Sequence, residues 1–222
     1  MKRRESGFSL LEMVIVLTIS LVVAGIMFIN TRDAIRNQRA DGALQDVLAM
    51  TRTAHQLAID KRRVFMVTYS STLPNQMTLT VTAPSNSSAG CGGATSQWPD
   101  APSTAANPTP VLGNFNFAWV TGAPNTATTA PDGFTGGSTT TPIALTSTVS
   151  PSLVCFYPDG SARDANNQFT SGVVYLAPST ASETSGTVRL NNMRAMTIFG
   201  PTGRISGWRL SQTSTGLQWK MW

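Results

Sequence analysis

The sequence has little charge and few of the side chains that carry out chemistry. Asp, Glu, Lys and Arg make up 12% of its 222 residues, and it contains one histidine and two cysteines. Catalytic bases, closed zinc sites and calcium loops all need such groups close together. We therefore expect no catalytic residue, no metal site and no cofactor, and a protein that is not an enzyme. The single histidine, His55, is expected to be partly buried and hydrogen-bonded at the rim of the core.

Proline is missing before Pro74, so nothing forces a break in the chain between Phe8 and Asp60. A single helix over that segment would be about 80 Å long. Its first part, residues 8–29, is apolar except for Glu12 and is long enough to cross a membrane as a helix. We expect residues 8–29 to be a transmembrane helix.

Ahead of this apolar run, residues 1–7 form a short basic leader with Lys2, Arg3 and Arg4 against Glu5. The bias of basic residues toward the cytoplasm places the N-terminus inside and the rest of the chain outside. A secretory signal would end its apolar stretch after about 7–15 residues at a small-x-small cleavage site, and this run continues further. We expect a single-pass membrane protein with a cytoplasmic N-terminus, whose bulk is exported.

Glu12 is the anomaly of the apolar run. A charged side chain at the membrane centre costs about 2.5–3.5 kcal/mol on insertion scales, so a carboxylate there indicates a function and an oppositely charged partner. An amine from a neighbouring chain would offset its desolvation and favour packing into a helical bundle. The alternative is a plain membrane anchor with an incidental Glu near the lipid headgroups.

The basic leader, Gly7, Phe8 and Glu12 together resemble the class III leader of type IV pilins and type II secretion pseudopilins. The resemblance implies that a prepilin peptidase cuts between Gly7 and Phe8 and methylates the new amine of Phe8. It implies that Glu12 compensates the N-terminal charge of a neighbouring subunit during assembly. The implied partners are other pilins or pseudopilins through the N-terminal helix, the peptidase and an inner-membrane assembly platform.

After Ile29 the pattern becomes amphipathic. The apolar residues on one broad arc of the continuing helix are Ala40, Ala43, Leu44, Val47, Leu48, Met50, Ala54, Ala58 and Ile59. Asp41 and Asp46 are among the residues that face away from this arc. A helix with such a stripe buries it against another element, and we expect residues 30–62 to pack on a sheet.

The remainder of the chain is strand-like. β-branched and aromatic runs occur at residues 64–69, 77–81, 115–120, 143–145, 153–157, 172–176, 187–190, 195–199 and 204–210. Turn residues between such runs indicate an antiparallel meander. We expect an α+β fold whose head, residues 63–222, carries a Thr/Ser/Pro/Gly-rich insertion at about 83–150 with one or two strands of its own.

Three features of the head resemble the GspH/FimT branch of minor pseudopilins. They are the helix-to-strand junction at residues 60–69, the Phe156–Gly160 hairpin and the Gly203-Arg204 turn. The resemblance implies a pilin-like fold, with a long helix packed on an antiparallel sheet. The implied function is a minor structural subunit, assembled near the tip of a type II secretion pseudopilus or a type IV pilus.

Cys91 and Cys155 lie in the part expected to be exported, where an oxidising compartment permits a disulfide. We expect them to pair, which would close a loop of about 64 residues and stabilise the head by about 4 kcal/mol in the chain-entropy account. Two free thiols are the alternative, because the sequence does not give the distance between them.

The C-terminal segment is basic and rich in tryptophan, and residues 189–222 contain no acid. Its basic residues are Arg189, Arg194, Arg204, Arg209 and Lys220, and its tryptophans are Trp208, Trp219 and Trp222. Such side chains neutralise phosphates and stack on bases. DNA binding by a minor pilin, for uptake in natural transformation, is therefore the alternative function.

Some members of the FimT side of the family bind DNA through a Gly-Arg-x-Arg turn, and this chain has Gly203-Arg204 without the second arginine. Arg209 would substitute only if it shares a face with Arg204, and on a regular strand the two point oppositely unless Gly207 marks a bulge. The competing interpretation is a solvated basic strand edge that discourages aggregation and contacts other pilins.

Overall fold

The computed structural model describes residues 10–70, 76–82, 91, 95–96, 115–118, 120, 122–126, 128–136, 142–146, 152–178 and 190–222. Among these, residues 26–33, 36, 70, 76–82, 95–96 and 116 are described by their backbone alone. The chain forms two units, Met1–Arg39 and Ala40–Trp222.

Helix α1 runs from Leu10 to Lys61 without interruption, as the missing prolines predict. It ends where Arg62 adopts a left-handed φ of 51°, a conformation that stops the helical hydrogen-bond pattern. In the first unit its apolar side chains are exposed, for example Leu10 at 82% and Leu21 at 71%. Within the described part of the chain, no helix combines the length and the hydrophobicity that a membrane span requires.

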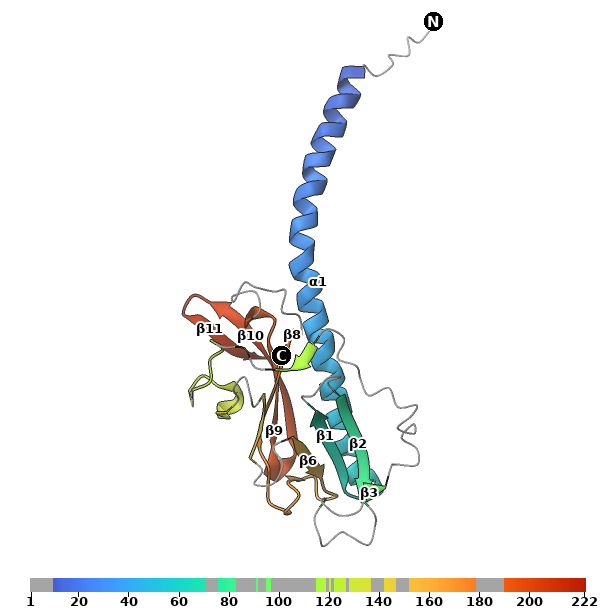
Figure 1. The fold of residues 1–222 in the computed structure, drawn as a ribbon, viewed down its shortest axis with the longest axis vertical. Coiled ribbons are helices and arrows are strands. Elements are labelled where there is room, and N and C mark those ends of the chain that lie inside the picture. Colours follow the sequence, from blue (N-terminus) through green and yellow to red (C-terminus); the bar gives the residue numbers. More distant parts are fainter. Residues whose placement is uncertain are drawn as a thin grey trace, which may run out of the picture. The chain divides into compact units, whose positions relative to one another are not determined.

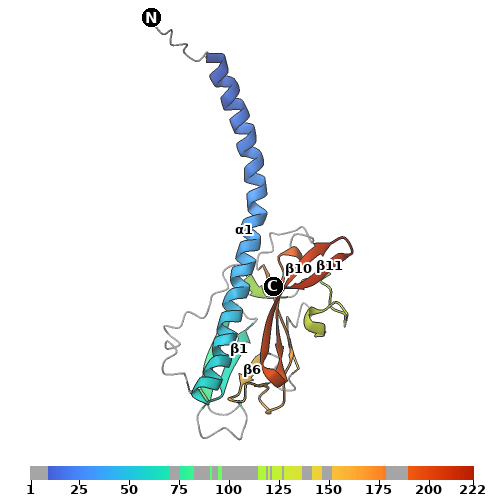
Figure 2. The ribbon, with the colours of Figure 1, turned by 180° about the vertical axis from the view of Figure 1, so that it is seen from behind.

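Two antiparallel sheets follow the helix (Figure 1; Figure 2). The strands are β1 Phe65–Ser70, β2 Gln76–Thr82, β3 Thr95–Ser96, β4 Phe115–Phe117, β5 Ile143–Leu145, β6 Leu153–Phe156, β7 Ala162–Arg163, β8 Gly172–Pro178, β9 Arg194–Phe199, β10 Arg204–Thr213 and β11 Gly216–Met221. The first sheet has the order β3-β2-β1-β6-β7, and the second has the order β11-β10-β9-β8-β4, with β5 also pairing with β8.

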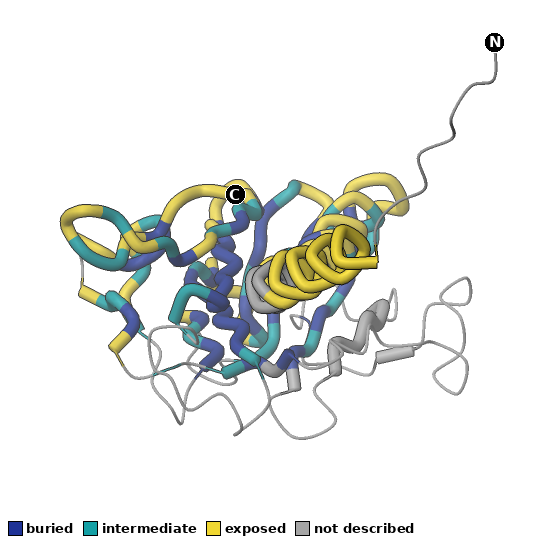
Figure 3. Tube along the Cα trace, turned by 90° about the horizontal axis from the view of Figure 1, so that it is seen from above, coloured by how far each residue is buried: buried dark blue, intermediate teal, exposed yellow. Residues whose placement is uncertain are grey.

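One core lies between the second half of α1 and both sheets. Figure 3 colours the buried residues of the described chain dark blue. Leu44, Val47 and Leu48 are buried in this core, which confirms the predicted apolar arc. The helix approaches β10 closely because Gly207 lacks a side chain, and an added Cβ would lie 2.8 Å from Leu48 Cδ1. Ile59, predicted on the same arc, is instead 44% exposed in the last turn of the helix.

A buried hydrogen bond joins α1 to the first sheet. Thr51 Oγ1 lies 3.1 Å from the Tyr69 hydroxyl and donates to the Val47 carbonyl at 2.8 Å. Burial raises the pKa of Tyr69 far above its ordinary value, and the hydrogen bond to Thr51 opposes this only in part. Tyr69 is therefore a neutral core residue whose hydroxyl has its partner.

The second sheet is buried on both of its faces. In β8, Val174 and Leu176 join the core beneath α1, whereas Val173, Tyr175 and Ala177 join a second cluster on the opposite face. That cluster also contains Trp219 and Leu210 and is covered by part of the predicted insertion, through Val120, Ala123 and Phe134. These residues of the insertion thus form a packing layer over the second sheet.

The expected α+β, pilin-like arrangement is confirmed: a helix is followed by antiparallel sheets. The apolar runs inside the insertion form β4 and β5, and both pair with β8. The predicted strand at 187–190 falls outside the described residues except for Leu190, which is helical. Strand β11 was not predicted, because Leu217-Gln218-Trp219-Lys220-Met221 lacks the β-branched residues that favour strands.

Candidate functional site

The processing residues predicted from the sequence, Gly7 and Phe8, lie outside the described residues. Glu12 is in the first turn of α1 and is exposed. It lies among apolar side chains that are exposed as well, such as Leu11 at 69% and Met13 at 58%. A carboxylate on such a surface is suited to meeting an amine when this surface packs against other helices.

Arg194 is a structural residue, contrary to its predicted place on a basic binding surface. It is 3% exposed, and its Nε donates to Asp41 Oδ1 at 2.7 Å. Its Nη1 donates to the carbonyls of Asn191 and Met193 at 3.0 and 2.9 Å. Asp41, predicted to face away from the sheet, instead supplies the counter-ion, because a charge buried at this depth requires one.

Arg204 is engaged with the insertion on the outer face of the second sheet. Its Nη2 donates to Asp132 Oδ2 at 2.6 Å, and the Thr197 hydroxyl donates to the same oxygen at 3.3 Å. Trp208 Nε1 in turn donates to Thr197 Oγ1 at 3.0 Å. These groups form a chain of hydrogen bonds that fastens the short 3₁₀ turn Pro131–Gly133 to β9 and β10.

The register of β10 separates Arg204 from Arg209. Its pairing with β9 proceeds one residue at a time from Arg204 opposite Phe199 to Arg209 opposite Arg194, so Gly207 marks no bulge. Because side chains alternate along a strand, the two arginines point to opposite faces. Arg209 is instead paired across the strands with Lys220, and both are exposed. Arg189 lies outside the described residues.

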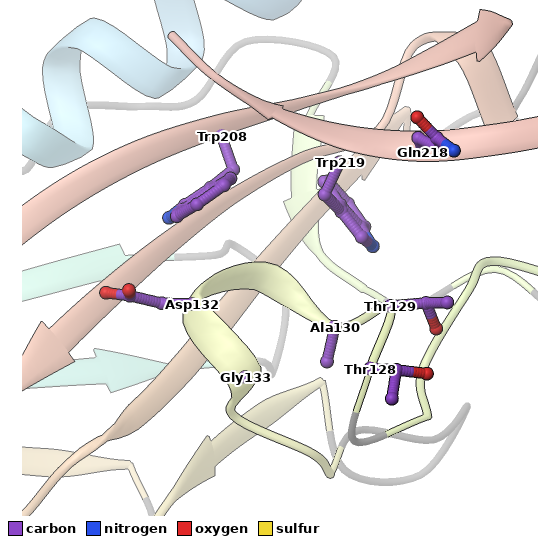
Figure 4. Close-up of a pocket in the computed structure, with 8 residues that line it drawn as sticks. All are labelled: Thr128, Thr129, Ala130, Asp132, Gly133, Trp208, Gln218 and Trp219. Atoms are coloured by element: carbon purple, nitrogen blue, oxygen red, sulfur yellow. The ribbon is translucent and has the colours of Figure 1, made fainter.

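A cavity of about 460 Å³ opens between the insertion and the β10–β11 hairpin (Figure 4). Thr128, Thr129, Ala130, Asp132, Gly133, Trp208, Gln218 and Trp219 line it. Figure 4 shows both indoles extending from their strands toward the loop that carries Asp132 and Ala130. The sequence suggests Trp208 and Trp219 only as partners for bases. Nothing in the sequence near Asp132 indicates that it joins them, because it lies far away along the chain.

His55 has the partly buried, hydrogen-bonded place predicted for it. Its Nε2 donates to the Gly160 carbonyl at 3.0 Å, and its ring meets Phe156 edge-on at 5.4 Å. Gly203, in the second of the two resembling turns, packs against the same groups with a left-handed φ of 60°. The two turns that carry the family resemblance therefore meet at the end of α1.

Around Arg163 lies a polar network that the sequence did not suggest. Arg163 donates to Asp159 Oδ2 at 2.6 Å and to the Ser161 hydroxyl at 2.8 Å, and its guanidinium lies 4.8 Å from the centre of the Tyr157 ring. Desolvation raises the pKa of Asp159, but the hydrogen bonds from Ser161 and the nearby Arg163 outweigh it, so this pKa lies below its ordinary value. Desolvation also raises the pKa of Tyr157.

Cys91 and Cys155 form the predicted disulfide, with 6.1 Å between their Cα atoms. It joins a residue of the insertion to β6, and both cysteines are buried beside Val64 and Tyr157. Among the described residues, His, Cys, Asp and Glu side chains do not gather in any group of three that would bind a metal ion.

The comparisons with known proteins bear on the N-terminal segment. Residues 2–28 match the prokaryotic N-terminal methylation motif, which is the type IV pilin-type prepilin signal. No curated protein and no solved structure matches the chain.

This motif indicates a type IV pilin-like protein that prepilin peptidase processes and that assembles with other pilins. It indicates a structural subunit rather than an enzyme, anchored in a membrane or located in a pilus. The matched residues include Gly7, Phe8 and Glu12, on which the resemblance rests.

Proposed function

We propose that the chain is a minor pilin or pseudopilin of the GspH/FimT type, assembled near the tip of a type II secretion pseudopilus or a type IV pilus. The observation that carries this proposal is the methylation motif at residues 2–28 with Glu12 inside it. The meeting of the Phe156–Gly160 hairpin and the Gly203 turn on α1 supports the GspH/FimT assignment, because these are the segments that resemble that branch.

In this proposal residues 1–7 are a leader that is removed, residues 8–29 are the transmembrane and assembly helix, and residues 30–62 are its amphipathic second half. Residues 63–222 are the head, located in the periplasm before assembly. The subunit resides in the inner membrane before assembly. When the assembly platform extracts the subunit, its Glu12 pairs with the methylated amine of a neighbouring subunit. Charge neutralisation in a low-dielectric helix bundle would favour that step.

The test follows the full chain in its native host. N-terminal sequencing of the membrane-bound protein should begin at N-methylated Phe8, and Glu12→Gln should be cleaved normally yet be absent from sheared filaments. Glu5→Gln is the matched control, since Glu5 belongs to the leader and should leave incorporation unchanged. A mature protein that still begins at Met1, or normal incorporation of Glu12→Gln, would contradict the proposal.

A separate measurement tests whether the protein is a minor subunit. Quantifying this subunit in purified filaments, and locating it by immunogold labelling, should give few copies, concentrated at filament ends. Many copies along the shaft would instead assign it as a major subunit, while leaving its processing unaffected.

The alternative, DNA binding by a minor pilin, retains one supporting observation. Arg209 and Lys220 are exposed cross-strand neighbours in the part of the chain without acids. Titrating the full chain in detergent with duplex DNA at rising salt tests it, because phosphate contacts make the logarithm of the binding constant fall linearly with the logarithm of the salt concentration. Salt-sensitive binding lost in Arg209→Gln/Lys220→Gln but kept in Arg204→Gln would support it, and no binding by the wild type would exclude it.

A further inference from the structure

The cavity between the insertion and the β10–β11 hairpin has one wall made of two indoles. Trp208 lies opposite Met221 and Trp219 lies opposite Leu210, so the two tryptophans are diagonal neighbours on one face of adjacent strands. Trp219 Nε1 donates to the Pro124 carbonyl at 3.0 Å, and Trp208 Nε1 donates to Thr197. Since both N–H groups are already bonded, the indoles offer the cavity apolar ring surface with a negative π face.

The opposite wall is polar and comes from residues 128–133. Asp132 Oδ2 accepts hydrogen bonds from Arg204 and Thr197, whereas no described residue donates to Asp132 Oδ1. Thr128 is exposed at the rim, with its hydroxyl 3.3 Å from that of Thr126. The wall therefore offers a ligand one carboxylate oxygen as acceptor and one hydroxyl that donates or accepts.

The charge of Asp132 is already balanced. Arg204 forms an ion pair with it at 2.6 Å, and the Asp132 side chain is 19% exposed. A cationic ligand would gain little beside this pair, and an anionic one would face the carboxylate. The matching ligand is neutral, with hydroxyl donors along one edge and polarised C–H groups on a flat face.

The size and opening of the cavity agree with such a ligand. Its volume of about 460 Å³ lies within the range of about 300–1,000 Å³ common for small-molecule sites. Thr128, Thr129 and Gly133 at its rim are exposed, so a longer chain can continue outward from a bound group. A plain aromatic or aliphatic group would leave Asp132 Oδ1 desolvated without a donor.

We propose that this cavity binds a single pyranose ring, free or at the end of a glycan, with its apolar face on Trp208 and Trp219 and a hydroxyl donating to Asp132. The inference uses only the head and is independent of how the N-terminal helix is processed or assembled.

The test is saturation-transfer difference NMR on the full chain, purified in a polyoxyethylene detergent because maltoside and glucoside detergents would compete. The probes are the methyl glycosides of glucose, galactose, mannose and N-acetylglucosamine, with N-acetyltryptophanamide as an aromatic competitor of another class. Transfer is expected to the ring C–H protons of at least one glycoside. Trp208→Ala should weaken its binding at least about tenfold, since the stacking surface is lost.

Three further variants complete the test. Asp132→Asn removes the charged acceptor and should weaken binding, but it also removes the ion pair with Arg204. Thr128→Val, which changes an exposed hydroxyl without touching the core, should weaken binding without lowering stability. Trp222→Ala, which removes an exposed tryptophan that does not line the cavity, should bind like the wild type. The proposal is overturned if the wild type shows no transfer to any glycoside, if Trp208→Ala binds as well as Trp222→Ala, or if only the tryptophan amide binds.

Discussion

Four basic side chains that look equivalent in the sequence have three different roles in the structure. Arg194 is buried and paired with Asp41, and Arg204 fastens the insertion through Asp132. Arg209 and Lys220 remain exposed to solvent. The difference arises from strand register and burial, because a guanidinium inside the fold must have a partner whereas one at the surface needs none.

The Arg194–Asp41 pair predicts an asymmetric response to removing acids from α1. Asp41→Asn should lower the free energy of unfolding by about 1–3 kcal/mol, because it leaves a buried guanidinium without its counter-ion. Asp46→Asn is the control, since Asp46 is exposed on the same helix, and it should change stability by no more than about 0.5 kcal/mol. Urea unfolding of both variants in detergent measures this, and equal losses would contradict the assigned role of Asp41.

Asp159 predicts a pH dependence of stability. Its pKa in the folded protein lies below that of the unfolded chain, which is about 3.9. Its contribution to stability is therefore present above about pH 4 and is lost as the pH falls through the folded-state pKa. The thermal midpoint of Asp159→Asn should lie below that of the wild type at pH 7, and the gap should close in acid.

The same gap should also shrink when Arg163 is replaced by Met in both backgrounds, because Arg163 supplies part of the lowering of this pKa. A gap that does not depend on pH, or that Arg163→Met leaves unchanged, would refute this account of Asp159.

The turn at residues 158–160 and the turn at Gly203 meet beside His55 near the end of α1, and the absence of a side chain at Gly203 permits this contact. An added Cβ at Gly203 would run into the Gly160 carbonyl oxygen and lie 2.7 Å from His55 Nε2. Gly203→Ala should therefore destabilise the protein more than Gly216→Ala. Both positions have positive φ, but Gly216 has open space around it. A φ of 60° is less strained for alanine than the φ of 118° at Gly216, so a larger loss at Gly203 would be due to crowding. A smaller loss of unfolding free energy at Gly203 than at Gly216 would contradict this account.

The layer formed by residues 122–126 and 128–134 should become less protected from exchange when its ion pair is removed. Arg204→Ala takes away the donor to Asp132, so amide hydrogen exchange in these residues should speed up. Arg209→Ala should leave exchange there unchanged, because Arg209 projects from the other face of β10. Hydrogen exchange measured by mass spectrometry distinguishes the two variants. Unchanged protection in Arg204→Ala would show that packing alone holds the layer in place.

For the molecule as a whole, the disulfide is the main covalent constraint on the head. Cys91 and Cys155 are separated by 64 positions, and replacing both with serine should cost about 4 kcal/mol in the chain-entropy account. Reduction of the wild type should lower its thermal midpoint to near that of the double variant. If the reduced wild type is as stable as the oxidised protein, packing around β6 stabilises the head without the disulfide.

Most of the fold could be predicted, because its signals are local. The missing prolines and the apolar arc predicted α1, and β-branched runs predicted β1, β2, β8, β9 and β10. Strand β11 was not predicted, because Gln218 and Lys220 make the segment resemble a solvent-exposed tail. Its pairing with β10 makes it a strand. The role of Asp132 was not predicted, because its hydrogen-bond partners, Arg204 and Thr197, are 72 and 65 positions away in the sequence.

Local chemistry was therefore enough to predict the prepilin-type motif at residues 2–28, the helix and the alternating strands, since each depends on neighbours along the chain. Three-dimensional contacts assigned the rest: which arginine is buried, which oxygen of Asp132 accepts from Arg204, and that described residues of the insertion cover a second apolar face. Those outcomes depend on contacts between residues far apart in sequence. Such contacts matter for stability because a polar group removed from water needs a hydrogen-bond partner inside the fold.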